Sequence, residues 1–242
     1  MTRLLHKLLY RVLPLRGYLR TVSRLYFLSL RLGLGRRSEA MEYVYMLPKA
    51  VRAGDVCIDI GANLGYYARP LSKIAGPRGR VIAVEPVPVM REVLERNLRR
   101  CTNTQILPYA LGGEKRTVTM CNDSALTAGY LGTGRNRVEE NPAAEALRFE
   151  AQMRRGSELF ARLERLDFIK CDVEGYELHI MRDMRPLLER FHPTVLIETG
   201  GENRPQIIEL FTQMGYRAET LEKGRLVPLE KENGKDILFL HD

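Results

Sequence analysis

The chain lacks the features that mark membrane-spanning, disulfide-stapled and zinc-dependent proteins. Its longest apolar run near the start extends only from Leu25 to Leu30, which is too short to cross a bilayer. Arginines interrupt every apolar stretch in the first 37 residues, so a secretory signal fits poorly. The four cysteines form no C-x-x-C pair, and the four histidines lack the spacing of metal ligands. These absences favour a cytoplasmic protein with reduced thiols and no resident metal.

Acidic residues are missing from the N-terminal arm, by which we mean residues 1–37. The arm holds nine Lys and Arg, whereas the rest of the chain has 29 basic and 30 acidic residues, so the net charge of +8 belongs to the arm. Leucines recur at helical spacing on both sides of Pro14, and Arg3, Lys7 and Arg11 form a separate stripe. We expect two amphipathic helices that end near Gly33.

A basic amphipathic arm has three possible interpretations. It suits reversible attachment to an anionic membrane surface, which would place the protein peripherally on the cytoplasmic face. Alternatively, its leucines pack on the protein's own domain and its arginines face water. The third interpretation is contact with nucleic acid, which is not expected, because no aromatic stacking platform accompanies the arm.

Residues 38–242 alternate between strands and helices, which predicts one doubly wound α/β domain with a mostly parallel sheet. The expected strands are 55–60, 80–84, 105–110, 166–171, 194–198, 216–221 and 236–240, with a small extra strand at 117–121. The expected helices are 38–51, 66–75, 88–100, 176–191 and 204–214. Residues 122–156 break this rhythm and predict a loop or lid insertion with one short helix. A turn at Glu232-Asn233-Gly234 joins the last two strands.

Glycines and acids cluster where the first two strands end, and ligands on such sheets bind beyond the carboxyl ends of the strands. Asp59 ends the first strand, and Gly61, Asn63 and Gly65 follow it. The two glycines permit a tight turn and a close approach of the backbone to a ligand. Glu85 follows the second strand, and its two carboxylate oxygens suit a pair of ribose hydroxyls.

Two later segments complete the predicted cofactor site. The loop that begins at Ala110, after the third strand, is placed to lie along an adenine. Beyond the extra strand, Asn122, Asp123 and Ser124 are equal candidates for a contact with the adenine, and nothing in the sequence chooses among them.

The segments CIDIGANLGYY, VIAVEP, ALGG and FIKCDVEGYE resemble the FkbM family of S-adenosylmethionine-dependent methyltransferases. The resemblance covers about residues 40–242 and implies a class I methyltransferase (Rossmann-like) fold with a seven-stranded sheet whose last strand is antiparallel. It implies S-adenosyl-L-methionine as cofactor and O-methylation of a small-molecule, glycan or glycolipid acceptor. By the same resemblance, Gly61 and Gly65 would pass beneath the methionine moiety, Asp59 would hold its amino group, and Glu85 would bind the ribose.

Charged residues at the end of the fourth strand are the candidates for catalysis. A hydroxyl acceptor must lose a proton as its oxygen gains the methyl group, and a positioned carboxylate can accept that proton. Asp172 is the first choice for this base and Glu174 the second. Lys170 shares a strand face with Asp172, and a lysine in an apolar strand needs a carboxylate partner such as Asp172 or Glu198.

Other interpretations of these residues stay open at this point. The Lys–Asp–Glu group can be a structural ion network, or Asp172, Glu174 and Glu198 can hold a divalent cation for metal-assisted methylation. A dinucleotide-dependent oxidoreductase is an alternative, although Asn63 stands where its fingerprint has a glycine. A non-catalytic peripheral membrane protein is the last alternative.

Overall fold

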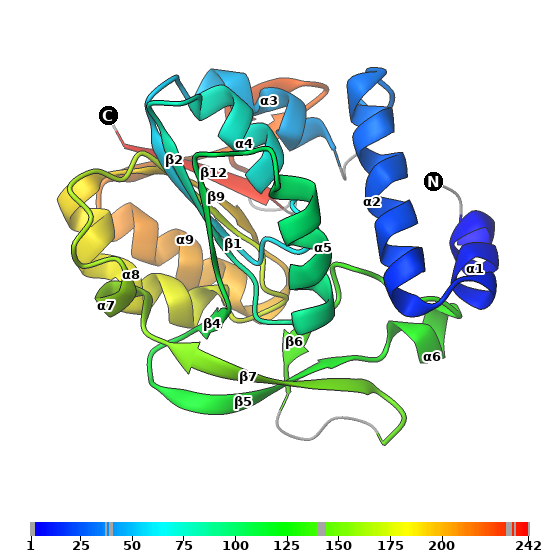
Figure 1. The fold of residues 1–242 in the computed structure, drawn as a ribbon. Helices are drawn as coiled ribbons and strands as arrows, with labels where there is room; N and C mark the ends of the chain where they lie inside the picture. The colour runs from blue at the N-terminus through cyan, green and yellow to red at the C-terminus, as the bar shows by residue number, and fades with distance from the viewer. Residues whose placement is uncertain are drawn as a thin grey trace.

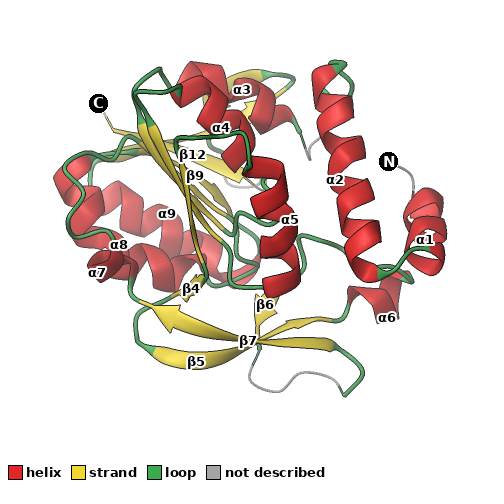
Figure 2. Cartoon of the chain, in the orientation of Figure 1, coloured by secondary structure: helices red, strands yellow, loops and turns green. Residues whose placement is uncertain are grey.

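The computed structural model describes residues 3–36, 38, 41–139, 144–230, 234 and 236–241. Its centre is an eight-stranded sheet with the order β11-β10-β12-β9-β8-β1-β2-β3 (Figures 1 and 2). The strands are β1 (Val56–Ile60), β2 (Arg80–Val84), β3 (Thr104–Leu107), β8 (Phe168–Cys171), β9 (Thr194–Glu198), β10 (Tyr216–Glu222), β11 (Arg225–Pro228) and β12 (Asp236–His241). Strands β3, β2, β1, β8 and β9 are parallel, whereas β12 runs antiparallel between β9 and β10.

Helices cover both faces of this sheet, as the period-two pattern of the strands predicts. Ile58 and Ile60 of β1 pack toward α8 and α9, while Cys57 packs toward α3 and α4. The helices after the N-terminal arm are α3 (Glu42–Ala50), α4 (Ala68–Ala75), α5 (Pro88–Leu98), α6 (Ser124–Ala128), α7 (Gly156–Leu159), α8 (Glu177–Phe191) and α9 (Arg204–Gln213), with a 3₁₀ turn η1 (Gly201–Asn203).

The arm forms the two predicted helices, α1 (Arg3–Val12) and α2 (Leu15–Arg31), which meet at Pro14. Helix α2 packs on the domain, because Tyr18 and Leu19 are fully buried in an apolar cluster that includes residues of α5. Helix α1 has no buried residue and contacts the domain through one face, where His6 stacks on Tyr130. The two helices therefore form a hairpin along the side of the domain (Figure 1). No helix in the described ranges is both long and apolar enough to cross a membrane.

Residues 122–156 form the predicted loop insertion only in part. The end of β5, together with β6 and β7, belongs to a second sheet with the order β4-β7-β5-β6, in which β7 pairs with β5 along its length (Figure 2). The strands are β4 (Tyr109–Leu111), β5 (Arg116–Asn122), β6 (Arg137–Val138) and β7 (Leu147–Arg154). The predicted short helix is present as α6. The prediction missed β7 because the alternation of exposed and buried residues in that strand was overlooked.

Two strand predictions also need correction. The expected strand 105–110 is divided at Pro108, where the chain leaves the main sheet as β3 and enters the second sheet as β4. The expected seven-stranded sheet has an eighth strand, β11, which forms a hairpin with β10 through Lys223 and Gly224. The predicted turn at Glu232-Asn233 lies outside the described residues.

Candidate active site

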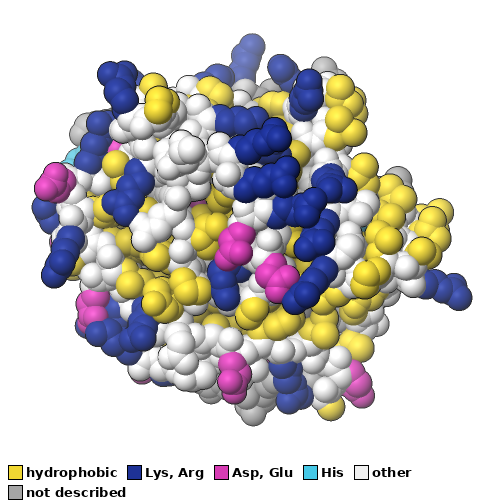
Figure 3. Space-filling view, in the orientation of Figure 1, with side chains coloured by type: hydrophobic (Ala, Val, Ile, Leu, Met, Phe, Trp, Pro, Cys, Tyr) yellow, Lys and Arg dark blue, Asp and Glu magenta, His cyan; other side chains and the backbone are white. Residues whose placement is uncertain are grey.

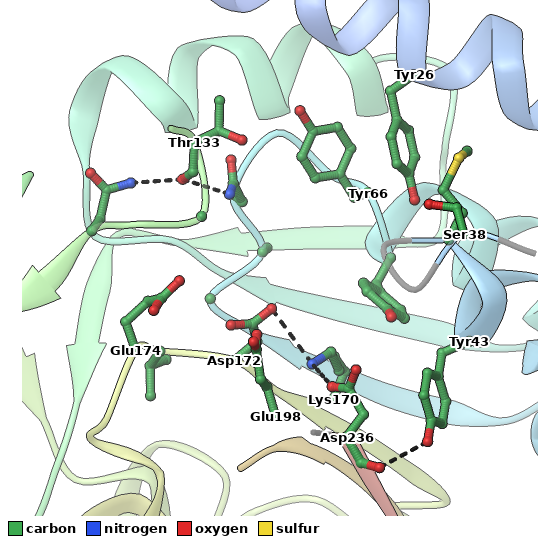
Figure 4. A pocket seen from close by; sticks show the side chains of 18 of the residues that line it. Tyr26, Ser38, Tyr43, Tyr66, Thr133, Lys170, Asp172, Glu174, Glu198 and Asp236 are labelled. Atoms are coloured by element: carbon green, nitrogen blue, oxygen red, sulfur yellow. Dashed lines mark hydrogen bonds and ion pairs between the residues drawn. The ribbon is translucent and has the colours of Figure 1, made fainter. Parts of the chain in front are cut away.

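A cavity of about 1210 Å³ lies where the carboxyl ends of the parallel strands meet the start of β12. Its floor includes side chains that follow β1, β2, β8 and β9. The α1–α2 hairpin forms another part of its wall through Leu5, His6, Val22, Leu25, Tyr26 and Ser29. Figure 4 shows Tyr26 of α2 across the cavity from the charged residues of the sheet. The volume exceeds the roughly 300–1,000 Å³ of a typical small-molecule site, so the cavity has room for a cofactor and an acceptor.

The turn after β1 packs directly against the end of β8. Gly61 has φ +78°, and a Cβ at this position would overlap the carbonyl oxygen of Asp172. The backbone N–H groups of Gly61 and Ala62 both donate to the carbonyl of Val84 at the end of β2. The ends of β1, β2 and β8 therefore contact one another at Gly61, where only glycine fits.

Asn63 and Glu85 form the next part of the cavity wall. Glu85 accepts hydrogen bonds from the backbone N–H groups of Asn63, at 2.7 Å, and Val87, at 2.8 Å. Burial raises the pKa of Glu85 to about 7, although these two N–H groups oppose the shift. The Asn63 side chain donates from Nδ2 to the carbonyl of Thr133, whereas its buried Oδ1 has no partner within the described residues.

A buried lysine organises the carboxylates at the end of β8. Lys170 is 1% exposed, and its Nζ lies 3.6 Å from both Asp172 Oδ2 and Asp236 Oδ1 (Figure 4). The same ammonium lies 5.2 Å from the centre of the Tyr67 ring. Burial acts to lower the pKa of Lys170, but Asp172 and Asp236 outweigh it and raise this pKa well above its ordinary value. Lys170 is therefore a fixed cation.

Glu198 shares a hydrogen bond with Asp172. Burial, the charge of Asp172 and this hydrogen bond together raise the pKa of Glu198 to about 8. The raised pKa favours the protonated form of Glu198, which donates a hydrogen bond to the Asp172 side chain. The Asp172 side chain is 32% exposed, so one side of the carboxylate stays open to the cavity.

The loop after Asp172 is shaped by a residue that sequence reasoning missed. Glu177, which is 4% exposed at the start of α8, accepts hydrogen bonds from the backbone N–H groups of Val173 and Gly175 at 3.0 Å each. Glu174 has φ +56° in this loop and is exposed. Figure 4 shows its carboxylate at the cavity wall, apart from the group around Lys170.

Six of the ten predicted site residues line the cavity, and four do not. Gly61, Asn63, Glu85, Lys170, Asp172 and Glu174 are in its wall. Gly65 faces α5, where an added Cβ would lie 3.0 Å from Leu94. Ala110 is buried in the cluster beneath α2 and α5, and Asp123 forms an ion pair with Arg137 at 3.0 Å.

Asp59 lies behind the cavity wall. It is 1% exposed, accepts a hydrogen bond from the backbone N–H of Ala68, and keeps one carboxylate oxygen without a partner in the described structure. Burial raises its pKa to about 7, although the nearby Lys170 opposes this shift. Asp59 pairs with Lys170 in the register of β1 and β8, and its predicted contact with the amino group of the cofactor stays a prediction.

Asp236 was absent from the predicted site, although the topology could have indicated it. Because β12 is antiparallel, its first residue lies at the same edge as the last residues of the parallel strands. Asp236 pairs with Glu198 in the register of β12 and β9. An acid at the start of an antiparallel last strand is therefore the pattern that would have found it.

Comparison with known proteins identifies the family to which this site belongs. The family model of the methyltransferase FkbM domain matches residues 59–218, which include the turn at Gly61 and the group around Asp172. The chain belongs to the FkbM methyltransferase family. The enzymes of this family depend on S-adenosyl-L-methionine, so the chain is a methyltransferase with that cofactor and not a dinucleotide-dependent oxidoreductase.

Curated relatives agree with this assignment at low identity. The methyltransferase sdnD of Sordaria araneosa is 25% identical over 189 residues, which are 66% of this chain and 72% of that protein. The hexuronic acid methyltransferase AglP of Haloferax volcanii is 22% identical over 185 residues, 76% of this chain and 72% of that protein. Among solved structures, the methyltransferase FkbM from Methylobacillus flagellatus shares the fold with a TM-score of 0.51 and 15% identity. That match covers 82% of this chain but only half of the other chain.

The residues of this FkbM methyltransferase fit its cofactor. Asn63 Oδ1 is a buried acceptor in the cavity wall without a donor among the described residues, and the cofactor carries donors in its ammonium group and ribose hydroxyls. Glu85 stands beside Asn63 with a carboxylate suited to a pair of hydroxyls. When bound, S-adenosyl-L-methionine supplies the electrophilic methyl group, and the chain supplies binding and alignment.

The carboxylates around Lys170 differ from a metal-binding set. The Lys170 ammonium lies between Asp172 and Asp236, so a fixed positive charge already balances these carboxylates. Across the described residues, no group of three or more His, Cys, Asp and Glu side chains has an arrangement that could hold a metal ion.

Proposed function

We propose that this enzyme methylates a hydroxyl oxygen of a sugar, glycolipid or natural-product acceptor, with Asp172 as the general base. The observation that carries the proposal is the environment of Asp172. Its carboxylate is open to the cavity and is held by Lys170 and Glu198, and its backbone carbonyl packs against the Gly61 turn of the predicted cofactor site. A base in this place is positioned to receive the proton of an acceptor that faces the methyl donor.

Asp172, Lys170 and Glu198 have separate roles in the proposed reaction. Asp172 accepts the proton as the acceptor oxygen attacks, a step for which a positioned base contributes roughly 10²–10⁴-fold in rate. Lys170 pairs with Asp172 and holds its carboxylate in place, with its own pKa raised well above the ordinary value. Protonated Glu198 donates a second hydrogen bond that helps to orient the Asp172 side chain. Holding donor and acceptor at attack distance contributes up to about 7–11 kcal/mol more.

Polar groups on the acceptor side of the cavity support a hydroxylated substrate. The Tyr26 hydroxyl, contributed by α2, is buried in the wall and has no hydrogen-bond partner in the part of the chain that the structure describes. Tyr43, Tyr66 and Tyr67 also line the cavity, and aromatic rings pack well against the apolar faces of sugars. The similarity to a hexuronic acid methyltransferase favours the same substrate class.

The test of the acceptor class uses methyl-labelled S-adenosyl-L-methionine. The enzyme is incubated with glycan, lipid and small-molecule fractions of a host extract, and the labelled product is analysed by mass spectrometry. We expect the label as a methyl ether on a sugar or alcohol. Label on nitrogen, on carbon or only in protein would refute the O-directed assignment.

The test of the base is the Asp172→Asn variant. We expect its labelled-product formation to fall by at least ~10²-fold, because the amide cannot accept the proton. Binding of S-adenosylhomocysteine, measured by calorimetry, should survive, which separates catalysis from folding. Glu174→Gln is the matched control and should keep most of its activity. A fully active Asp172→Asn variant excludes Asp172 as the base, and a rate abolished by EDTA would instead support the metal-assisted alternative.

A further inference from the structure

The outer face of the α1–α2 hairpin carries an unusual concentration of exposed apolar side chains. Of the nine large hydrophobic residues that are exposed in the described structure, seven belong to residues 4–34. Leu5 also lines the cavity, and the other six are Leu4, Leu8, Val12, Leu28, Leu32 and Leu34. Scattered single exposures are ordinary, but a local concentration marks an interaction surface. Figure 3 shows this apolar surface along the edge of the molecule that α1 and α2 form.

The apolar residues of α1 are accompanied by a row of cations. Leu4, Leu8 and Val12 are four residues apart and 78%, 58% and 68% exposed, so they form one row along the helix. Exposed Arg3, Lys7 and Arg11 share the same spacing and form the neighbouring row. His6 lies on the other side of the helix, where its ring donates to or accepts from the Tyr18 hydroxyl at 2.8 Å. The docked side of α1 is thus distinct from its apolar and cationic side.

A second cationic feature lies beside the hairpin, and the charge distribution along the sequence does not indicate it. A groove of about 510 Å³ between α2, α4 and α5 is lined by six cations and no carboxylate: Arg24, Arg69, Lys73, Arg96, Arg99 and Arg100. None of the six forms an ion pair within the described ranges. Figure 3 shows basic side chains gathered over these helices, on the same face as the apolar edge. We call this feature the cationic groove.

We infer that this face is a docking surface for an anionic lipid bilayer. The cationic groove is complementary to lipid phosphates, and the apolar row of α1 is complementary to the acyl region just below them. Nucleic acid would match the cations but would leave the exposed leucines without a partner. Because the inner side of the same hairpin lines the active-site cavity, docking brings the cavity to the lipid headgroups.

The inference is tested by flotation of the full-length chain with vesicles. Vesicles of phosphatidylcholine with phosphatidylglycerol serve as the anionic surface, and vesicles of phosphatidylcholine alone are the comparison. We expect flotation with the anionic vesicles only, weakened by salt. Absence of flotation, or retention by a homopolymer RNA in its place, overturns the inference.

Two sets of variants examine the two parts of the surface. Each cation near an anionic surface strengthens partitioning about fivefold, so Lys73→Ala/Arg96→Ala/Arg99→Ala should weaken binding by roughly 10²-fold. The matched control Arg162→Ala/Lys223→Ala/Arg225→Ala removes the same charge from exposed sites outside the groove and should cost far less. Equal losses of vesicle binding in the two triple variants would show that only net charge matters, and would refute a specific role of the cationic groove.

The second set replaces Leu4, Leu8 and Val12 with serine. These side chains are exposed, so the thermal midpoint should stay within a few degrees of the wild type while flotation is lost. Leu126→Ser is the matched control, because Leu126 is 52% exposed on α6. Undiminished flotation of the triple serine variant would show that the apolar row does not enter the bilayer. Labelled-product formation on a soluble acceptor should be unchanged in the groove variant, so the result is independent of the proposed function.

Discussion

The contact between Gly61 and Asp172 gives the sharpest test of how the fold positions the catalytic group. The substitution Gly61→Ala should lower the free energy of unfolding for two reasons. A residue with φ +78° leaves the region that L-residues prefer, which costs about 1–2 kcal/mol. The added Cβ also overlaps the carbonyl oxygen of Asp172, and separating two packed backbone segments costs a further ~1–3 kcal/mol.

Gly224 provides a matched control for the first cost. It also has φ +78°, but an added Cβ there meets nothing within 4 Å. The difference in melting temperature between Gly224→Ala and Gly61→Ala therefore isolates the overlap. For a chain of this size 1 kcal/mol corresponds to about 2–4 °C, so we expect Gly61→Ala to melt roughly 2–12 °C below the control.

The same substitution should reduce activity more than stability alone explains. Relief of the overlap moves Asp172 away from the turn, and a misplacement of about 1 Å can cost on the order of 10²-fold in rate. Labelled-product formation is measured well below both melting temperatures, with Gly224→Ala as the reference. If Gly61→Ala has the same melting temperature as Gly224→Ala and stays active, the close packing of β1 against β8 does not position the base.

Three further predictions address the charged residues of the cavity. Lys170→Met leaves Asp172 and Asp236 without their cation, so the free energy of unfolding measured in urea should fall by about 3–5 kcal/mol. An unchanged urea midpoint would contradict the ion-pair assignment. Glu198 binds its proton more tightly when folded, with a pKa of about 8, so it makes stability fall as pH rises from about 4.5 to 8. Melting curves of Glu198→Gln should therefore decline less over that window than those of the wild type, and parallel curves would exclude the raised pKa. Glu85→Ala should weaken S-adenosylhomocysteine binding in calorimetry, and an unchanged affinity would reject its ribose role.

Local sequence patterns predicted the central sheet well, because its strands are short apolar runs bounded by glycine, proline or charge. The runs that became β1, β2 and β9 were placed within one residue of their observed ends. In the second sheet, β5 was predicted as the extra strand 117–121, whereas β7, a half-buried strand whose pattern alternates over eight residues, was missed. The hairpin of β10 and β11 was missed because its turn is Lys-Gly, a weaker pattern than Asn-Gly or Asp-Gly.

The candidate site was predictable where chemistry follows directly from a strand end. Gly61, Glu85, Lys170 and Asp172 were found in this way and line one cavity. The contributions that depend on distant segments were not predictable from spacing. Asp236 reaches Lys170 only because β12 inserts antiparallel between β9 and β10. The cationic groove likewise combines cations from α2, α4 and the end of α5, which are far apart in the sequence.

The α1–α2 hairpin lines the cavity from outside the segment that matches the family model. The segment that matches the family model, residues 59–218, contains the proposed base and most of the predicted cofactor contacts, whereas the hairpin that closes one side of the reaction chamber precedes it. Because Tyr18 and Leu19 belong to the core, only the cavity-lining positions of the hairpin are open to redesign. We expect substitutions at Leu25 and Ser29 to change the shape of the chamber while the proposed base and its lysine partner stay in place.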